Sequence, residues 1–169
     1  MNGPGLPLLV SGARVRLILI THADAAEMLA GRRQQRWHAD YPRRDDLDAV
    51  SMIRADADPV DSTWGPRHVV HEMQAVGSVG FFGPPVDGEV EVGYGLVEGL
   101  RGRGIATEAL QALLAETDRL GIRVRASVLP ENAPSIRVLA KSGFTDLRGS
   151  TEDGELVMAR PMPAGRPAP

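Results

Sequence analysis

The feature that most constrains the fold lies near the middle of the chain, where residues 90–114 read VEVGYGLVEGLRGRGIATEALQALL. An alternating apolar run, typical of a β-strand, gives way to glycines and two arginines and then to apolar residues at helical spacing. A strand that ends in glycines and opens a helix leaves several backbone N–H groups without partners, and the helix dipole adds partial positive charge there. The sequence therefore predicts an anion-binding elbow between a strand over residues 89–97 and a helix over residues 103–120.

Two known phosphate-binding loops do not fit this elbow. A Walker loop ends in Gly-Lys-Ser or Gly-Lys-Thr, which the segment lacks, and the dinucleotide fingerprint fits only with Thr107 in place of its third glycine. The local chemistry still favours phosphate. Arg101 and Arg103 supply charges suited to phosphate oxygens, while Gly102 and Gly104 let a ligand approach the backbone.

Composition narrows the domain organisation and the function classes. A chain of 169 residues predicts one domain, over residues 11–160, with mobile tails rich in Gly, Pro and Ala over residues 1–10 and 161–169. A formal net charge of -3 argues against nucleic acid as a ligand. The absence of cysteine excludes disulfides and thiolate metal sites. No apolar run approaches the roughly 20 residues of a membrane span, so we expect a cytoplasmic protein with no membrane partner.

Further strands and helices follow from the remaining pattern. Strands are predicted over residues 13–20, 67–73, 77–83, 122–129, 144–148 and 155–162, with a tight turn around residues 75–77. Helices are predicted over residues 21–31, 45–53 and 130–143, the last capped by Asn132. Antiparallel hairpins early and alternating strands and helices late predict a three-layer α+β or α/β domain with a mixed sheet. No metal is expected, because His68 and His71 are three apart on a strand and face opposite sides.

The elbow and a second segment together resemble a known family. LRGRGIATEAL, residues 100–110, resembles the Arg/Gln-x-x-Gly-x-Gly/Ala pyrophosphate loop of the GNAT superfamily of acyl-CoA N-acyltransferases, with Arg101, Gly104 and Ala106 in its three signature positions. VLPENAPSIRVLAKSGF, residues 128–144, resembles the family's second block, in which an Asn caps a helix and the run ends Lys-x-Gly-Phe. The opening segment, residues 15–30, is more loosely similar to the RimJ- and RimL-like branch that acetylates the N-termini of ribosomal proteins.

The resemblance implies a fold and a binding mode. The fold is a mixed, splayed sheet with helices on both faces, in which the strand over residues 89–97 parts from the strand over residues 123–129. The thioester arm of acetyl-CoA lies in the gap, and Gly93 and Gly95 share a strand face on which we expect them to clear space for it. The implied contacts are Leu96, Val97 and Asn132 for the arm, and Arg101, Gly102, Arg103, Gly104, Ile105, Ala106 and Thr107 for the pyrophosphate.

Two residues are candidates for the chemistry. Glu91 resembles the glutamate that deprotonates the amine in the family, although an exposed strand face would also carry a glutamate. Many relatives protonate the leaving thiolate with a tyrosine on the second-block helix, but Leu139 stands at that position. Ser135 matches the serine that is thought to replace it in the ribosomal-protein branch, and a serine there is equally an ordinary capping residue.

The ionisation of amines bears on which acceptor the protein uses. An α-amino group titrates near ~8 and is about one-tenth neutral at pH 7, whereas a lysine, near ~10.4, is neutral in only about one case in 2,500. Without an evident strong base, an α-amine is the easier acceptor. Trp37, His38 and Tyr41 fall in the region that borders the acceptor in relatives, and are either substrate contacts or core residues.

The function predicted is therefore an N-acetyltransferase that moves an acetyl group from acetyl-CoA to a primary amine by direct attack in a ternary complex, a protein N-terminus being favoured. Two alternatives stay open: an acetyltransferase for small amines, and an acyl-CoA-binding sensor domain without turnover. The partners expected are acetyl-CoA and the acceptor amine, and a homodimer is left open.

Overall fold

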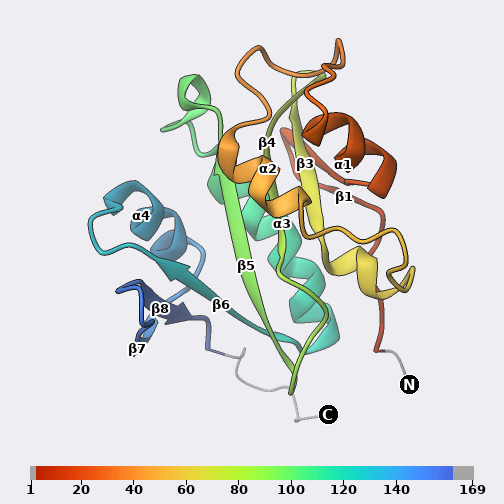
Figure 1. Ribbon diagram of the computed structural model, residues 1–169. Helices are drawn as coiled ribbons and strands as arrows, with labels where there is room; N and C mark the ends of the chain where they lie inside the picture. Colours follow the sequence, from red (N-terminus) through yellow and green to blue (C-terminus); the bar gives the residue numbers. More distant parts are fainter. Residues whose placement is uncertain (1–2, 162–169) are drawn as a thin grey trace.

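The computed structural model describes residues 3–161, and its centre is a mixed sheet in the order β1-β2-β3-β4-β5-β6-β8-β7 (Figure 1). Neighbouring strands pair antiparallel except β5 and β6, which pair parallel. The strands are β1 (Leu9–Ser11), β2 (Val15–Leu19), β3 (Pro66–His71), β4 (Gln74–Phe81), β5 (Glu89–Leu96), β6 (Arg123–Val128), β7 (Asp146–Ser150) and β8 (Leu156–Ala159).

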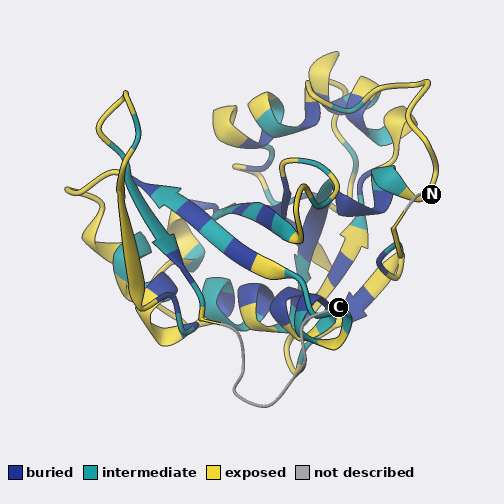
Figure 2. Cartoon of the chain, turned by 90° about the horizontal axis from the view of Figure 1, so that it is seen from below, coloured by how far each residue is buried: buried dark blue, intermediate teal, exposed yellow. Residues whose placement is uncertain are grey.

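Helices cover both faces of this sheet. They are α1 (His22–Leu29), α2 (Arg44–Val50), α3 (Ile105–Leu120) and α4 (Ala133–Lys141), with single turns of 3-10 helix η1 (Asp61–Trp64) and η2 (Glu98–Leu100). Helices α1 and α2 contact each other on one face, and α3 and α4 contact each other on the other, with the sheet between the two layers (Figure 2). The predicted three-layer domain is confirmed. No helix within residues 3–161 is long and apolar enough to cross a membrane.

Helix α3 packs its apolar stripe against the sheet and forms the wall behind the elbow. Its buried positions are Ile105, Ala109, Leu110, Leu113, Leu114 and Thr117. The prediction began this helix at residue 103, but Gly102 and Gly104 have φ angles of 78° and 77°, so the helix begins only after Gly104. Gly121, with φ of 71°, ends it as predicted.

Strands β5 and β6 separate, as the family resemblance implied. Their parallel pairing covers three positions and ends with Glu91 opposite Arg125. Beyond this point β5 continues to Leu96 and β6 to Val128 on diverging paths (Figure 1). The gap that opens between them has a backbone edge on each side.

The packed part of the chain begins earlier than the sequence indicated. The N-terminal tail was placed over residues 1–10, but Leu6 and Val10 are each 5% exposed and β1 pairs with β2. The backbone N–H of Leu6 donates a hydrogen bond to Thr63 Oγ1 at 2.9 Å. Thr63 lies 57 positions away in the sequence, so the local composition could not reveal this contact. Residues 1–2 and 162–169, which include nearly all of the predicted C-terminal tail, lie outside the described residues.

The hairpin between β3 and β4 also turns at another place. The turn was predicted around residues 75–77, but Glu72 and Met73 form it with φ angles of 47° and 69°. Positive φ at both central residues is the geometry of a two-residue hairpin whose twist matches the strands. Ala75 and Val76 are buried strand residues instead, because they face the core.

Candidate active site

The elbow leaves backbone donors free at the start of α3. The first hydrogen bond within the helix runs from Glu108 N to Gly104 O, so the N–H groups of Ile105, Ala106 and Thr107 have no acceptor within the helix. In the part of the chain that the structure describes, no side chain caps the helix at Gly104. These donors and the positive end of the helix dipole can therefore serve an anion.

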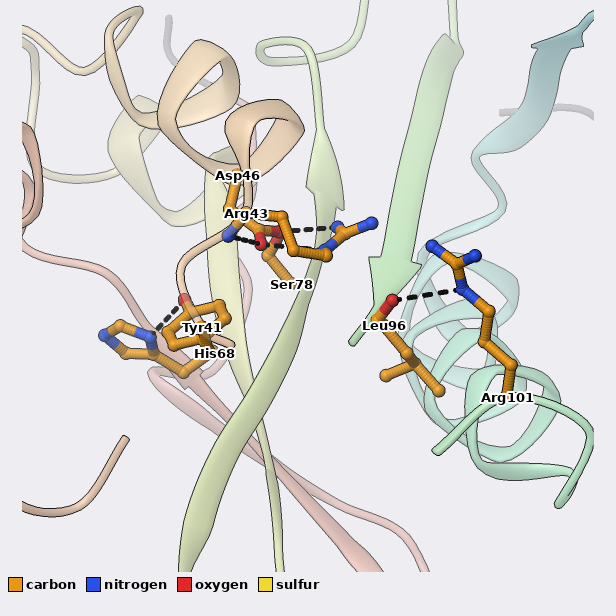
Figure 3. Close-up of polar contacts among 7 residues, drawn as sticks. All are labelled: Tyr41, Arg43, Asp46, His68, Ser78, Leu96 and Arg101. Atoms are coloured by element: carbon orange, nitrogen blue, oxygen red, sulfur yellow. Dashed lines mark hydrogen bonds and ion pairs between the residues drawn. The ribbon is translucent and has the colours of Figure 1, made fainter. Parts of the chain in front are cut away.

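The arginines of the elbow are arranged differently from the prediction. Arg101 turns back across the end of β5, where its Nε donates to Leu96 O at 3.3 Å (Figure 3). Arg103 is exposed, and its carbonyl accepts a hydrogen bond from Arg14 Nη1 at 3.2 Å. Arg14 is a third elbow arginine that sequence reasoning missed, because it precedes the loop by about 90 residues and no local pattern marks it.

Arg14 is fixed by an acidic residue in the first turn of α3. Its backbone N and its Nε donate to the Glu108 carboxylate at 2.6 and 2.9 Å. Burial works to raise the pKa of Glu108, but the hydrogen bonds and the charge of Arg14 outweigh it and hold that pKa below its ordinary value. The start of β2 is thus joined to the elbow by a charged pair.

The wall of the gap formed by β5 presents backbone rather than side chains. Leu96 and Val97 are 4% and 0% exposed, so the contacts expected of them with a thioester arm are limited to backbone groups. Val97 N donates to Val76 O on β4, which directs its N–H away from the gap. Because successive strand residues point their backbone groups to opposite sides, the N–H of Leu96 faces the gap.

On α4, Ser135 has a partner that the sequence analysis did not name. Tyr94 reaches from β5 and places its hydroxyl 2.8 Å from Ser135 Oγ and 3.1 Å from Ser135 O. Burial raises the pKa of Tyr94 although the hydrogen bond with Ser135 opposes this, so the phenol stays protonated at neutral pH. Leu139 is 1% exposed and packs in the core. A tyrosine hydroxyl is thus present at Ser135, and it comes from β5 rather than from α4.

The helix cap beside Ser135 is as predicted. Asn132 precedes α4, and its Oδ1 accepts a hydrogen bond from Ser135 N at 3.2 Å. One donor at the start of the helix is satisfied in this way, and the amide group of Asn132 remains on the exposed side of the cap.

Glu91 stands at the point where the strands part. Its Oε1 accepts a hydrogen bond from Ser127 Oγ at 2.9 Å, and Arg125 Nε lies 3.4 Å away. Its side chain is 28% exposed. Glu89, one step deeper in the paired ladder, binds Arg125 Nη1 at 2.8 Å and also Arg148. Glu91 is therefore a carboxylate held in place at the closed end of the gap, where it shares Arg125 with Glu89.

The space over Gly93 and Gly95 is filled. A Cβ atom on Gly93 would lie 2.8 Å from Cζ of the Phe82 ring, and one on Gly95 would lie 2.6 Å from Nη1 of Arg43. This corrects the expectation that the two glycines clear room for a thioester arm. They make room for an aromatic ring and a guanidinium on the face that α1 and α2 cover.

Arg43 belongs to a buried polar cluster that sequence reasoning missed (Figure 3). Its Nε and Nη2 donate to Asp46 at 3.0 and 2.8 Å, and its backbone N donates at 2.8 Å. The hydroxyl of Ser78 on β4 donates to the same carboxylate. Asp46 is fully buried, while 19% of the Arg43 side chain is exposed. In the sequence, Asp46 three residues after Arg43 indicates only a helix cap.

The three candidate acceptor contacts separate into core and surface. Tyr41 is 0% exposed and bonds His68 Nδ1 at 2.7 Å, so it cannot touch an acceptor in this conformation (Figure 3). Trp37 is 7% exposed and packs edge-on against Tyr41. His38 stays partly exposed, with its Nδ1 accepting from Asp40 N. Tyr41 and Trp37 are thus packing residues, which was the alternative reading.

Burial dominates the titration of the Tyr41 and His68 pair. It raises the pKa of Tyr41 well above its ordinary value and, against the opposing charges of Asp24 and Asp46, lowers the pKa of His68. Within residues 3–161, no group of three or more His, Cys, Asp or Glu side chains gathers in a way that could hold a metal ion.

Solved structures with the same fold include several acetyltransferases. A protein from Bordetella pertussis assigned to the GnaT family is 27% identical, with a TM-score of 0.62 over 92% of this chain and 100% of that one. Mycobacterium smegmatis RimJ in complex with CoA-disulfide is 25% identical, with a TM-score of 0.67 over 93% and 88%. The ribosomal-protein-S5-alanine acetyltransferase from Vibrio fischeri is 18% identical, with a TM-score of 0.65 over 95% and 100%, and shows the fold alone. None of the curated proteins matches in sequence.

The sequence itself matches the acetyltransferase (GNAT) domain over residues 14–145, which include the elbow, the gap and the helix that carries Ser135. The match spans most of the chain and confirms the resemblance found in the two sequence blocks. The chain belongs to the GNAT family of acetyltransferases.

Proposed function

We propose that this protein transfers an acetyl group from acetyl-CoA to a primary amine, with a protein N-terminal α-amine as the favoured acceptor, by direct attack in a ternary complex. One observation carries the proposal. The gap between β5 and β6 opens beside the uncapped N-terminus of α3, so a long anionic thioester fits with its phosphates at the elbow and its arm along β5.

Groups at two places, the elbow and the backbone edge of β5, support the binding of acetyl-CoA. The N–H groups of Ile105, Ala106 and Thr107 would hold the pyrophosphate, with Arg14 and Arg103 nearby to supply charge. The arm would then pair with the backbone edge of β5, as a peptide does when it extends a sheet. The thioester carbonyl would reach the N–H of Leu96, which would donate a hydrogen bond to the oxygen as negative charge develops there.

Proton transfer is assigned to residues on opposite sides of the gap. The amine nitrogen attacks the thioester carbon, and its proton passes to Glu91 through a chain of water molecules in the gap. The C–S bond then breaks, and Ser135 donates a proton to the departing thiolate while Tyr94 donates to Ser135 and is reprotonated from solvent. The site therefore has a proton donor although Leu139 stands at the position of the family's tyrosine, because Ser135 and Tyr94 supply the proton.

The choice of acceptor rests on a family resemblance and on the ionisation of amines. The structure of RimJ at 25% identity and the loose sequence resemblance favour protein N-termini. The large neutral fraction of α-amines at pH 7 favours the same acceptors. Small amines remain the second candidate, and direct comparison of the two classes decides between them.

The first experiment is calorimetric titration of acetyl-CoA into the wild-type protein and the variant Gly104→Asp, which places bulk and negative charge at the elbow. Gly121→Asp is the matched control, because Gly121 ends the same helix and has nearly the same φ, 71° against 77°. Acetyl-CoA should bind the wild type and Gly121→Asp and should not bind Gly104→Asp. Equal binding to all three would remove the elbow from the site.

Turnover is tested separately by acceptor-dependent release of free CoA. Tight binding of acetyl-CoA without release, across α-amine peptides and small amines, would leave a sensor domain rather than an enzyme. Release with either acceptor class supports the enzyme and identifies the class.

A further inference from the structure

The cluster of Arg43, Asp46 and Ser78 offers a fixed guanidinium at the acceptor side of the gap. Arg43 donates three hydrogen bonds to Asp46, and Ser78 donates a further one from β4. A long arginine side chain normally samples many rotamers, but here a fully buried carboxylate holds it in one. A guanidinium that is already ordered loses little entropy when it binds a ligand oxygen.

The side of this guanidinium that does not bind Asp46, with Nη1, lies beside β5. Within residues 3–161, Nη1 of Arg43 has no hydrogen-bond partner, and it lies 2.6 Å from where a Cβ on Gly95 would stand. Gly95 directly precedes Leu96, whose N–H faces the gap. Arg43 therefore lies next to the position at which an acceptor amine meets the thioester, on the face of the sheet where Glu91 also points.

The helix cap does not account for this arrangement. The cap of α2 needs only the bond from the backbone N of Arg43 to Asp46, which any residue at position 43 could supply. Burying an ion pair costs desolvation that the attraction of the charges barely offsets. A guanidinium directed over a glycine of the gap thus needs a reason beyond holding the helix.

A second side chain on the same face is also exposed. Phe82 is 68% exposed, and its ring covers Gly93, between Glu91 and Arg43 along β5. The distance along the strand from Glu91 to Gly95 is about 13 Å at about 3.3 Å per residue. A carboxylate, an apolar ring and a guanidinium thus follow each other along the face that an acceptor would approach.

We infer that Arg43 recognises an oxygen carried close to the acceptor amine, so that the acceptors are aminoacyl compounds such as peptide N-termini rather than simple alkylamines. In an α-aminoacyl group the carbonyl oxygen is three bonds from the amine nitrogen, close enough to reach Arg43 while the amine attacks. Asp46 balances the charge of Arg43, which favours a hydrogen-bonded oxygen at a defined position over any bulk anion. The inference rests on the proposed function, because it assigns the acceptor side of the same site.

The test compares two acceptors in two variants. The acceptors are a short peptide that begins with alanine and isobutylamine, which has no oxygen. Arg43→Lys keeps the charge beside Asp46 but loses the planar fork, and Arg44→Lys, on an exposed neighbour, is the control. Arg43→Lys should raise the KM for the peptide tenfold or more, with the isobutylamine reaction and the KM for acetyl-CoA unchanged. Arg44→Lys should change none of these.

A binding measurement keeps the inference testable without turnover. The acetylated product peptide is titrated calorimetrically into each protein in the presence of CoA, after thermal unfolding has shown that the variants are folded. Weaker binding to Arg43→Lys than to Arg44→Lys supports the inference. Equal binding to both, or an equal loss of rate with peptide and isobutylamine, would overturn it. A failure of the proposed function appears differently, as acetyl-CoA binding that Gly104→Asp does not affect or as no CoA release with any acceptor.

Discussion

The hydroxyl of Tyr94, on a strand at the centre of the sheet, lies 2.8 Å from the hydroxyl of Ser135, in the first turn of α4. The bond joins one wall of the gap to the helix beside the other wall. It gives Ser135 a fixed donor geometry, which a capping serine at the surface would not have. Both hydroxyls can therefore be tested as one unit.

Ser135→Ala should lower kcat by about 100-fold if Ser135 is the acid, because positioned proton transfer contributes at least this much. Tyr94→Phe should lower it by about tenfold, the value of one hydrogen bond of about 1.4 kcal/mol. The double variant should be no worse than Ser135→Ala, since Tyr94 acts through Ser135. Steady-state kinetics with the affinity for acetyl-CoA measured in parallel checks this. Additive losses would mean that the two residues act independently.

Glu91→Gln should lower kcat by about 100-fold at pH 7 and flatten the acidic limb of the pH profile, because the amide cannot accept the amine proton. The amide oxygen of the glutamine can still accept the hydrogen bond from Ser127, so the free energy of unfolding should change little. Glu72→Gln, in the exposed turn between β3 and β4, is the control. An unchanged pH profile in Glu91→Gln would assign proton removal to solvent.

The buried His68 should make the protein less stable in mild acid. Its folded-state pKa lies below the unfolded value, so the unfolded chain binds more protons as pH falls through about 6.5, and stability is lost towards the folded-state pKa. Urea unfolding at pH 7.5 and 5.5 should show a falling free energy of unfolding in the wild type and a smaller fall in His68→Gln. His22→Gln, at an exposed position, should behave as the wild type. The same fall in His68→Gln would assign the effect to other groups.

Peptide α-amines should react faster than lysine side chains at pH 7. The neutral fractions alone differ by about 250-fold, and this ratio should shrink as pH rises towards 10. Competition between the two amines of one peptide, read by mass spectrometry at pH 7 and 9, measures the ratio directly. Equal acetylation of both amines at pH 7 would show that the site contains a base strong enough to deprotonate lysine.

Much of the fold follows from local patterns in the sequence. The apolar spacing of α3, Gly121 at its end and the Asn132 cap of α4 are each fixed by residues within a few positions, and the structure has all three as predicted. The parting of β5 and β6 came from the family resemblance rather than from periodicity. The hairpin turn was misplaced because Glu72 and Met73 are not residues typical of positive φ.

The site is only partly readable in the same way. Arg14, Tyr94 and Arg43 each contact residues about 40 to 95 positions away, so their roles depend on the packed sheet and on no local signal. Tyr41 could be either a substrate contact or a core residue in the sequence, since an aromatic residue in this region gives the same local pattern in both cases. The glycines of β5 were expected to leave space for a ligand, but Phe82 and Arg43 fill that space.

The short ladder at which β5 and β6 meet has a mechanical consequence. Glu89 forms ion pairs there with Arg125 and Arg148, and Arg125 also lies 3.4 Å from the Glu91 carboxylate. A rotation of about 5° at this junction moves the far end of a strand, about 15 Å away, by about 1 Å. Misplacement by this amount can change a rate by about 100-fold. Changes at the closed end of the gap, where β5 and β6 still pair, can therefore alter the alignment of donor and acceptor at its open end.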